Sequence, residues 1–332
     1  MPELRKDPVI GRWVIISTER GKRPSDFEEV EVEQDNEFCP FCWNHEDNTP
    51  PEIFAIRPDK SSANKPGWTL RVIPNKFPAL RIEGQLNRQG EGIYDNMSGI
   101  GAHEVVIETS DHTKSLADLE ISGICNVLKI FRERILDLKK DMRLKYVMIF
   151  KNHGKSAGAS LNHTHSQLIA TPIIPKTVIE EMEGAKKYFE YKDRCIFCDI
   201  IRQEIHDQVR VVYEEECFIA LTPYAPRFPF ETWILPKDHS SHYESITDQM
   251  LEHLAITFKE VLGRINVALQ NPPYNFVVHT LPVQDDPDKS YHWHIEFMPK
   301  LTRVAGFEWG TGFHINPTSP EDSAEYLKNI TL

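Results

Sequence analysis

One pattern of potential metal ligands occurs twice along the chain, and this repeat constrains the fold more than any other feature. Each copy begins with a C-x-x-C pair and continues, in the same order, with an Asp-His dipeptide and an H-x-H triplet. The pairs are Cys39/Cys42 in the first copy and Cys195/Cys198 in the second. Two thiols and two imidazoles suit a tetrahedral zinc site. The recurrence of so long a pattern in one order predicts a duplicated unit with one metal ion per copy.

The residues between these motifs predict the same secondary structure in both copies. Apolar residues recur at helical spacing over 117–140 and again over 248–270. Each predicted helix is followed by a short strand-like run, at 146–150 and at 274–278. Further predicted strands are 12–17, 70–74, 104–109, 209–213, 217–221 and 232–236. The fold class is therefore α+β: a duplicated unit of mainly antiparallel sheets with helices packed on one face.

The length of the chain agrees with two such units. Its 332 residues suit about two domains of ordinary size. A Pro-containing, charged connector at 171–193 separates the copies, so we expect a first half at 1–180 and a second half, with a C-terminal tail, at 181–332.

Composition excludes several classes of function. The formal net charge of −12 argues against a nucleic-acid polymer as the main partner, while leaving room for a small basic pocket. No apolar run is long enough to span a membrane. The first residues lack the apolar core of a signal peptide, so we expect a cytoplasmic protein. Disulfides are rare in that compartment, which favours metal binding at the C-x-x-C pairs.

Two ligand sets compete in the second half. By analogy between the copies, the predicted zinc ligands are Cys39, Cys42, His112 and His163 in the first half, and Cys195, Cys198, His239 and His292 in the second. Four protein ligands close the coordination sphere, which indicates a structural role. The alternative set in the second half is Glu181, His279, His292 and His294, which would suit iron or zinc.

The strongest catalytic candidate is the segment His163-Thr-His165-Ser-Gln167. On a strand, residues two apart share a face, so His163, His165 and Gln167 point the same way. His163 can bind the metal while His165 faces a pocket. A neutral imidazole can attack phosphorus directly, and Gln167 can donate a hydrogen bond to a phosphate oxygen. The preceding loop, 152–160, has the small residues and donors that a phosphate requires.

These motifs resemble those of a known family. Cys195-Ile-Phe-Cys198 through Leu235-Pro-Lys-Asp-His239 resembles the opening of a histidine-triad domain, and H-x-H-x-Q at 163–167 resembles the signature of the galactose-1-phosphate uridylyltransferase family. The resemblance implies ping-pong nucleotidyl exchange between a nucleotide sugar and a sugar 1-phosphate. His165 is then the nucleophile that forms a nucleotidyl-histidine, and Gln167 stabilises that adduct.

The resemblance also implies a set of substrate contacts and a homodimer. Two arginines near the N-terminus are expected to reach a phosphate across the dimer. The predicted substrate-binding residues are Arg20, Arg23, Asn75, Asn152, Gly158, Ser160 and Phe307. In the second half the triplet is His292, His294 and Glu296, and a carboxylate in place of Gln would repel a phosphate. We therefore expect that half to be catalytically silent.

Two other functions remain open at this point. The segments 2–8 and 306–317 look more like the plant-type ADP-glucose phosphorylase branch, which transfers AMP to phosphate. This similarity leaves the base, the sugar and the acceptor undecided. A non-enzymatic alternative is a zinc-stabilised protein that binds nucleotides without turnover.

Overall fold

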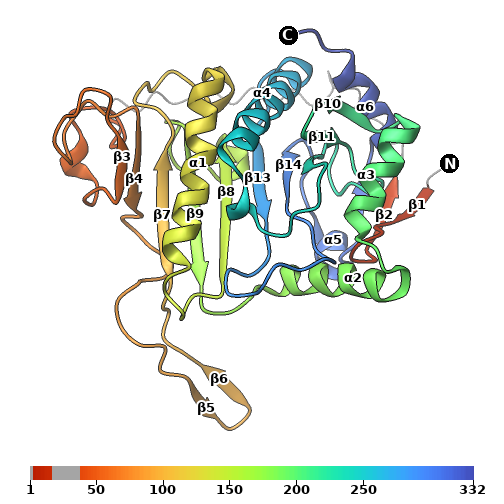
Figure 1. Cartoon of the computed structure of the whole chain (residues 1–332), viewed down its shortest axis with the longest axis horizontal. Coiled ribbons are helices and arrows are strands. Elements are labelled where there is room, and N and C mark those ends of the chain that lie inside the picture. The colour runs from red at the N-terminus through yellow and green to blue at the C-terminus, as the bar shows by residue number, and fades with distance from the viewer. Residues whose placement is uncertain (1–2, 17–37) are drawn as a thin grey trace.

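A ten-stranded antiparallel sheet forms the centre of the molecule. The computed structural model describes residues 3–16 and 38–332 (Figure 1). In spatial order the strands are β10 (Val211–Glu214), β11 (Phe218–Leu221), β12 (Thr232–Pro236), β14 (His294–Pro299), β13 (Tyr274–His279), β8 (Tyr146–His153), β9 (His165–Thr171), β7 (Ala102–Ile107), β4 (Leu70–Pro74) and β3 (Phe54–Ile56). Within this sheet, the described strands of the two halves meet where β13 pairs with β8. The strand order on one side of this junction mirrors the order on the other side.

Two long helices cover one face of this sheet. α1 (Ile121–Leu138) and α4 (Asp248–Leu269) pack against each other in front of the central strands (Figure 1). Their buried apolar residues recur every three or four positions, for example Ile124, Leu128 and Phe131 in α1. α4 starts after Thr247, whose hydroxyl oxygen accepts the Met250 N–H as an N-cap. Both helices lie where the apolar periodicity predicts them.

The opposite face of the second-half strands is also covered by helices. α2 (Lys176–Lys192) and α3 (Ile196–Asp207) lie there, and Phe197 packs in one apolar cluster with Ile219 and Leu235. The predicted connector at 171–193 is therefore mostly helix. In the first half this face is covered instead by the segment of Cys39 and Phe41. The predicted α+β class is confirmed, with this second pair of helices as an addition.

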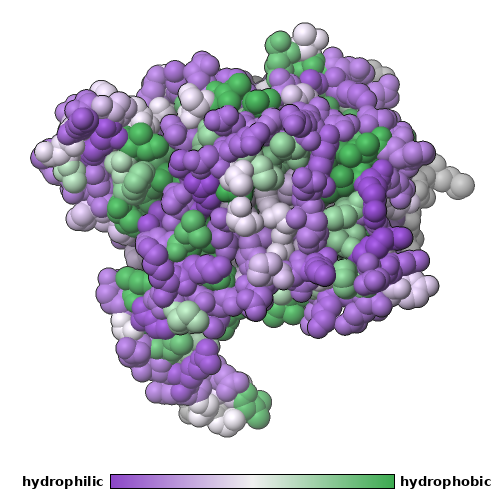
Figure 2. Space-filling model, viewed as in Figure 1, coloured by the Kyte–Doolittle hydropathy of each residue, from purple (hydrophilic) through white to green (hydrophobic). Residues whose placement is uncertain are grey.

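Smaller elements surround the main sheet. They are a sheet of β1 (Glu3–Lys6), β2 (Trp13–Ile16) and β15 (His314–Asn316), a hairpin of β5 (Gln89–Glu91) and β6 (Tyr94–Asn96), helices α5 (Gly306–Thr311) and α6 (Pro320–Lys328), and 3₁₀ turns η3 (Glu46–Asn48), η4 (Leu116–Asp118), η5 (Lys155–Ala157) and η6 (Tyr243–Ser245). The hairpin projects from the body of the molecule (Figure 1). The face shown in Figure 2 is mostly hydrophilic. None of the described helices is both long and apolar enough to cross a membrane.

Candidate functional site

The H-x-H-x-Q segment lies in the middle of the first half of the sheet. β9 pairs with β7 on one side and β8 on the other, with His165 opposite Ile107 and Gln167 opposite Val105 and Phe150. The alternate residue Leu168 is buried in the core under α1 and α4. Strand alternation therefore turns His165 and Gln167 toward the other face, as predicted.

The four predicted ligands of the first half converge at the start of this strand. Cys39 Sγ and Cys42 Sγ each lie 3.6 Å from His163 Nδ1, and Cys42 Sγ lies 3.4 Å from His112 Nδ1. Tetrahedral geometry with ordinary Zn–S and Zn–N bonds spaces the ligand atoms by about 3.5 Å. All four ligand atoms lie close enough together to hold one ion.

The protonation chemistry of this group also suits zinc. His163 Nε2 lies 2.8 Å from the Thr109 carbonyl oxygen, which can only accept, so the Nδ1 lone pair is turned toward the thiols. Burial and the neighbouring Cys39 raise the pKa of Cys42 to about 11. Two adjacent thiolates therefore need a cation between them. Cys and His ligands in this arrangement are those that zinc prefers.

The second half repeats this arrangement. Cys198 Sγ lies 3.4 Å from His239 Nδ1 and 3.6 Å from His292 Nδ1. The Nε2 atoms of the two histidines lie 3.0 Å from the carbonyl oxygens of Asp288 and Pro236. Together with Cys195 they form a second group that could hold one ion.

The alternative ligand set of the second half is not assembled among the described residues. His292 lies with the thiols, whereas Glu181, His279 and His294 form a separate group of three. The reason is that strand β14 begins only at His294, so strand geometry does not fix the direction of His292. His292 precedes β14 and lies beside Cys198 in the first turn of α3. His294, the first residue of β14, stacks on His279 of the neighbouring strand with ring centroids 4.7 Å apart.

His165 is held as a neutral imidazole with one defined tautomer. Its side chain is buried, with 6% of its surface exposed, and Phe41 packs edge-on against the ring. Its Nδ1 lies 2.8 Å from the His163 carbonyl oxygen and must therefore donate. Burial, followed by the nearby Lys151 charge, lowers the pKa of His165 to about 4. The lone pair at Nε2 is thus available as a nucleophile.

A buried ion pair between Lys151 and Glu108 contacts the start of β9. Lys151 Nζ donates to Glu108 Oε2 at 2.7 Å, to Thr164 Oγ1 at 2.8 Å and to the His165 carbonyl oxygen at 2.9 Å. The hydroxyls of Thr164 and Ser166 donate to the same carboxylate. Sequence analysis missed this cluster. The sequence feature that could have revealed it is Glu108, a charged residue that directly follows an apolar strand, where a buried apolar residue would be expected.

Gln167 also has partners that sequence analysis missed. Its Oε1 lies 2.8 Å from His103 Nε2 and 3.4 Å from Asn75 Nδ2. Asn75 was predicted to bind substrate, and the structure places it beside Gln167. His103 had no assigned role. Its position two residues before Val105, which pairs with Gln167, brings it to the same face of the sheet.

The end of β8 and the loop that follows it contain the other predicted contacts. Gly158 has φ +90°, a left-handed conformation that favours glycine, and it is exposed together with Ser160. Asn152 is held from the second half: Asn275 of β13 donates to Asn152 Oδ1 and to the Ala157 carbonyl oxygen, both at 2.8 Å. The Asn152 amide nitrogen is thereby turned away from β13.

Of the three remaining predicted contacts, Phe307 alone lies among the described residues, and it does not join this group within one chain. Arg20 and Arg23 lie outside the described residues. Phe307, 47% exposed, lies in α5 and packs against Phe313. Figure 1 shows α5 beside the small sheet at the second-half end of the molecule, well separated from β9. Sequence order could not reveal this separation, because the C-terminal segment returns to the N-terminal strands, where β15 pairs with β2.

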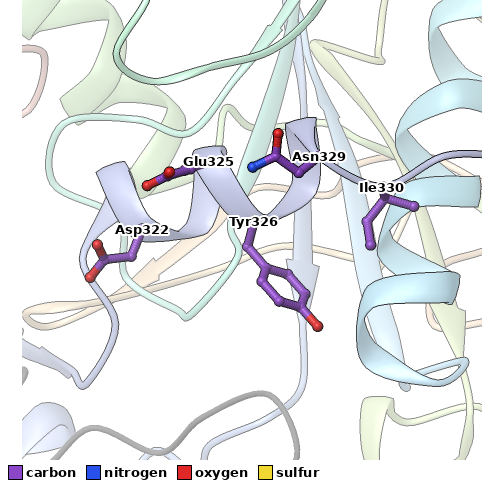
Figure 3. A pocket seen from close by; sticks show the side chains of 5 residues that line it. All are labelled: Asp322, Glu325, Tyr326, Asn329 and Ile330. Carbon is purple, nitrogen blue, oxygen red and sulfur yellow. The ribbon is translucent and has the colours of Figure 1, made fainter.

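A pocket elsewhere on the surface does not coincide with the predicted site. It lies on and just after α6 and is lined by Asp322, Glu325, Tyr326, Asn329 and Ile330 (Figure 3). Two carboxylates make it a poor place for a phosphate.

In the second half, the residues equivalent to His165 and Gln167 are already engaged. His294 is 1% exposed, and the rings of Phe197 and Trp233 lie with their centroids 5.1 Å from it. Glu296 forms an ion pair with Arg227. Arg227 and His279 outweigh burial and hold the pKa of Glu296 well below its ordinary value.

Comparison with known proteins identifies the family of the chain. The family model for the N-terminal domain of galactose-1-phosphate uridyl transferase matches residues 1–175, and the model for the C-terminal domain matches 181–322. The chain belongs to the galactose-1-phosphate uridylyltransferase family. It is therefore a nucleotidyltransferase, as the sequence motifs predict.

Two curated relatives span the whole chain. The ADP-glucose phosphorylase of Arabidopsis thaliana is 40% identical over 338 residues, covering 100% of this chain and 93% of the relative. The galactose-1-phosphate uridylyltransferase of Thermotoga maritima is 31% identical over 341 residues, covering 100% and 99%. A crystal structure of an Arabidopsis thaliana ADP-glucose phosphorylase with bound ADP-glucose superposes with a TM-score of 0.85 at 38% identity, with full coverage of both chains.

Proposed function

We propose that the protein exchanges a nucleoside monophosphate between a nucleotide sugar and a phosphate-bearing acceptor through a nucleotidyl-histidine at His165. The acceptor in the main proposal is a hexose 1-phosphate and the donor is UDP-glucose. The observation that carries the proposal is the neutral His165 ring, whose Nδ1–H is bound to the His163 carbonyl oxygen and whose Nε2 is left as nucleophile.

The chemical steps follow from this geometry. His165 Nε2 attacks the α-phosphorus, and the bond from that phosphorus to the bridging oxygen breaks, so that sugar 1-phosphate leaves with both bonding electrons. Gln167 donates an amide hydrogen to a non-bridging oxygen of the adduct. A phosphate oxygen of the acceptor then attacks the same phosphorus, and the N–P bond breaks to restore the imidazole. Asn75, Asn152, Gly158 and Ser160 complete the phosphate and nucleotide contacts in this proposal.

The first test is the mass of the intact protein after incubation with a nucleotide sugar. We expect one nucleotidyl group per chain in the unchanged protein, none in His165→Ala, and an unchanged yield in the surface control His206→Ala. Complete absence of an adduct with both UDP-glucose and ADP-glucose would contradict the proposed reaction and favour the non-catalytic nucleotide-binding alternative.

The same measurement tests the proposed division of labour between the halves. We propose that residues 1–180 form the catalytic half and residues 181–332 a silent half, because His294 is covered by aromatic rings and Glu296 is acidic. One adduct per chain supports this division, and two adducts per chain refute it.

A second candidate is an adenylyltransferase that releases ADP from ADP-glucose with inorganic phosphate as acceptor. The higher identity to the ADP-glucose phosphorylase relative, 40% against 31%, favours this candidate. A panel that crosses UDP-glucose and ADP-glucose with galactose 1-phosphate and phosphate separates the two reactions. Product formation only from ADP-glucose and phosphate would replace the main proposal with this one.

We further propose two zinc ions per chain, one in each group of two cysteines and two histidines. Zinc at His163 would hold the strand that carries His165, and its role there is structural. Free thiols at both groups suit the reducing cytoplasm. Iron at Glu181, His279 and His294 is the alternative. Elemental analysis of the purified protein should give two equivalents of zinc, and a stoichiometric content of iron would require the alternative.

We also propose a homodimer, because α5, which carries Phe307, lies apart from β9 within one chain. Arg20, Arg23 and Phe307 would then contact substrate from the partner subunit. Light scattering should give twice the chain mass of 38.4 kDa. A monomer with full activity would remove these three residues from the proposed site.

A further inference from the structure

The side-chain amide of Gln167 has two ends of opposite polarity, and only one of them can stabilise a phosphate. The NH₂ end donates a hydrogen bond to an anionic oxygen, whereas the carbonyl end repels it. Nothing in the H-x-H-x-Q motif itself decides which end faces His165. The decision comes from the groups that touch the other end of the amide.

His103 is the first of these groups, and its tautomer can be deduced. The backbone N–H of Ala79 donates to His103 Nδ1 at 3.1 Å. A backbone N–H can only donate, so Nδ1 carries no proton. The proton of the neutral ring therefore sits on Nε2, which lies 2.8 Å from Gln167 Oε1. His103 thus presents a donor to Gln167.

Asn75 is the second group, and its orientation is set in the same way. The backbone N–H of Phe77 donates to Asn75 Oδ1 at 2.9 Å. This contact turns the amide nitrogen of Asn75 toward Gln167 Oε1, at 3.4 Å. The two donor nitrogens lie 3.1 Å apart.

Two backbone N–H groups of the segment 75–79 therefore determine the direction of the Gln167 amide. We propose that His103 is a positioning residue, which holds the carbonyl end of Gln167 so that its NH₂ end faces the phosphate of the nucleotidyl-His165 adduct. This inference rests on the proposed function of His165 and Gln167. It assigns a role to a histidine that lies outside both metal groups and does not touch the reacting atoms.

The second half offers an internal contrast. Trp233 pairs with Glu296 just as Val105 pairs with Gln167. His103 lies two positions before Val105, so its equivalent is Glu231, two positions before Trp233. Glu231 accepts hydrogen bonds from Arg227 and from Trp233 Nε1. The silent half therefore has an acceptor where the proposed catalytic half has a donor.

The test is a double-mutant cycle on the rate of adduct formation in a single turnover. Leu at position 103 has no donor, so His103→Leu should lower this rate by roughly 10- to 100-fold, the range for a hydrogen bond to a charged group. Substrate affinity should change much less, because the amide acts on the adduct. In a Gln167→Ala background, His103→Leu should have almost no further effect.

Two further variants serve as rescue and control. His103→Gln can place an amide nitrogen near the position of Nε2 and a carbonyl oxygen near the Ala79 N–H, so it should recover most of the rate. His206→Leu, the same substitution on the surface of α3, should leave the rate unchanged. Circular dichroism establishes that each variant is folded.

The outcomes separate the inference from the proposed function. If the unchanged protein forms an adduct, but His103→Leu slows it equally with and without Gln167, the inference is refuted and the function stands. If the unchanged protein forms no adduct, both are refuted. Long-range ¹H–¹⁵N spectra of histidine-labelled protein give an independent result. The signal of His103 is the one that disappears in His103→Gln, and we expect it to show a neutral ring with its proton on Nε2. A protonated Nδ1 would overturn the inference.

Discussion

At the scale of single residues, the most informative feature is the buried pair of Glu108 and Lys151. Both side chains are essentially inaccessible, and Lys151 contacts the carboxylate and the backbone of His165 together. Burial opposes ionisation of Glu108, but Lys151 and three hydrogen bonds hold its pKa below the ordinary value of 4.5. The pair therefore links the folding of the core to the placement of the nucleophile.

Removing one partner should destabilise the protein strongly. Lys151→Met leaves an uncompensated carboxylate in the core, and the free energy of unfolding should fall by about 3–5 kcal/mol at neutral pH. Equilibrium denaturation measures this loss. Lys140→Met, an exposed lysine near the end of α1, should change the free energy of unfolding little. The double variant Glu108→Gln/Lys151→Met should lose less unfolding free energy than Lys151→Met, because it leaves no uncompensated carboxylate in the core.

The same pair predicts how stability depends on pH. In the unchanged protein the pKa of Glu108 is lowered, so its contribution is present above the unfolded pKa and is lost as the pH falls through the folded pKa. In Lys151→Met, burial raises the pKa of Glu108, because no positive charge opposes it. The loss of unfolding free energy should therefore shrink between about pH 7 and about pH 5, as the carboxyl is protonated. An equal defect at both pH values would contradict this assignment of the charges.

At the scale of elements, the contact between β8 and β13 makes the first half depend on the second. Register pairs Asn275 with Asn152. From there Asn275 holds both Asn152 and Ala157, and the proposed contacts Gly158 and Ser160 directly follow Ala157. The second half thus shapes the site although it supplies no reacting group in our proposal.

Asn275→Ala should therefore affect a site in the other half. The loop loses two hydrogen bonds, and we expect the rate of adduct formation to fall about tenfold with a loss of about 1–2 kcal/mol in unfolding free energy. Single-turnover kinetics and denaturation measure the two effects. Gln249→Ala, an exposed change on α4, is the control and should alter neither. Unchanged kinetics in Asn275→Ala would show that the loop is held in another way.

At the scale of the whole molecule, the two metal groups adjoin histidines to which we assign different roles. In each group a histidine carbonyl oxygen accepts the ring N–H of the next histidine: His163 from His165, and His292 from His294. In our proposal only His165 is a nucleophile, and the second group lies in the silent half. Both groups join segments that are distant in sequence, so both are expected to stabilise the fold.

Removing one ligand from each group should separate these roles. Cys39→Ser and Cys195→Ser should each lower the zinc content by about one equivalent per chain and lower the midpoint of thermal unfolding. Cys39→Ser should reduce the rate of adduct formation at least tenfold more than Cys195→Ser, because only the first group adjoins His165. Elemental analysis and single-turnover kinetics measure both effects. A larger kinetic defect in Cys195→Ser would contradict the proposed division.

Local patterns in the sequence were sufficient for the two central helices, for most strands of the main sheet and for much of the site. Helical periodicity predicted α1 and α4, because burial of one helix face demands it. Strand alternation placed His165 and Gln167 on one face. The repeated order of Cys and His predicted both four-residue metal groups, since the duplication supplied two copies of one geometry.

Tertiary structure decided what no local pattern contains: which strands lie side by side. That pairing placed His292 with the thiols and His294 with Glu181, although the two histidines are separated by one residue. It also brought His103 to Gln167 and Asn275 to Asn152 from far along the chain. The physical reason is that motifs record which side chains a site needs, whereas lateral strand pairing and burial determine which backbone groups, charges and neighbours orient them.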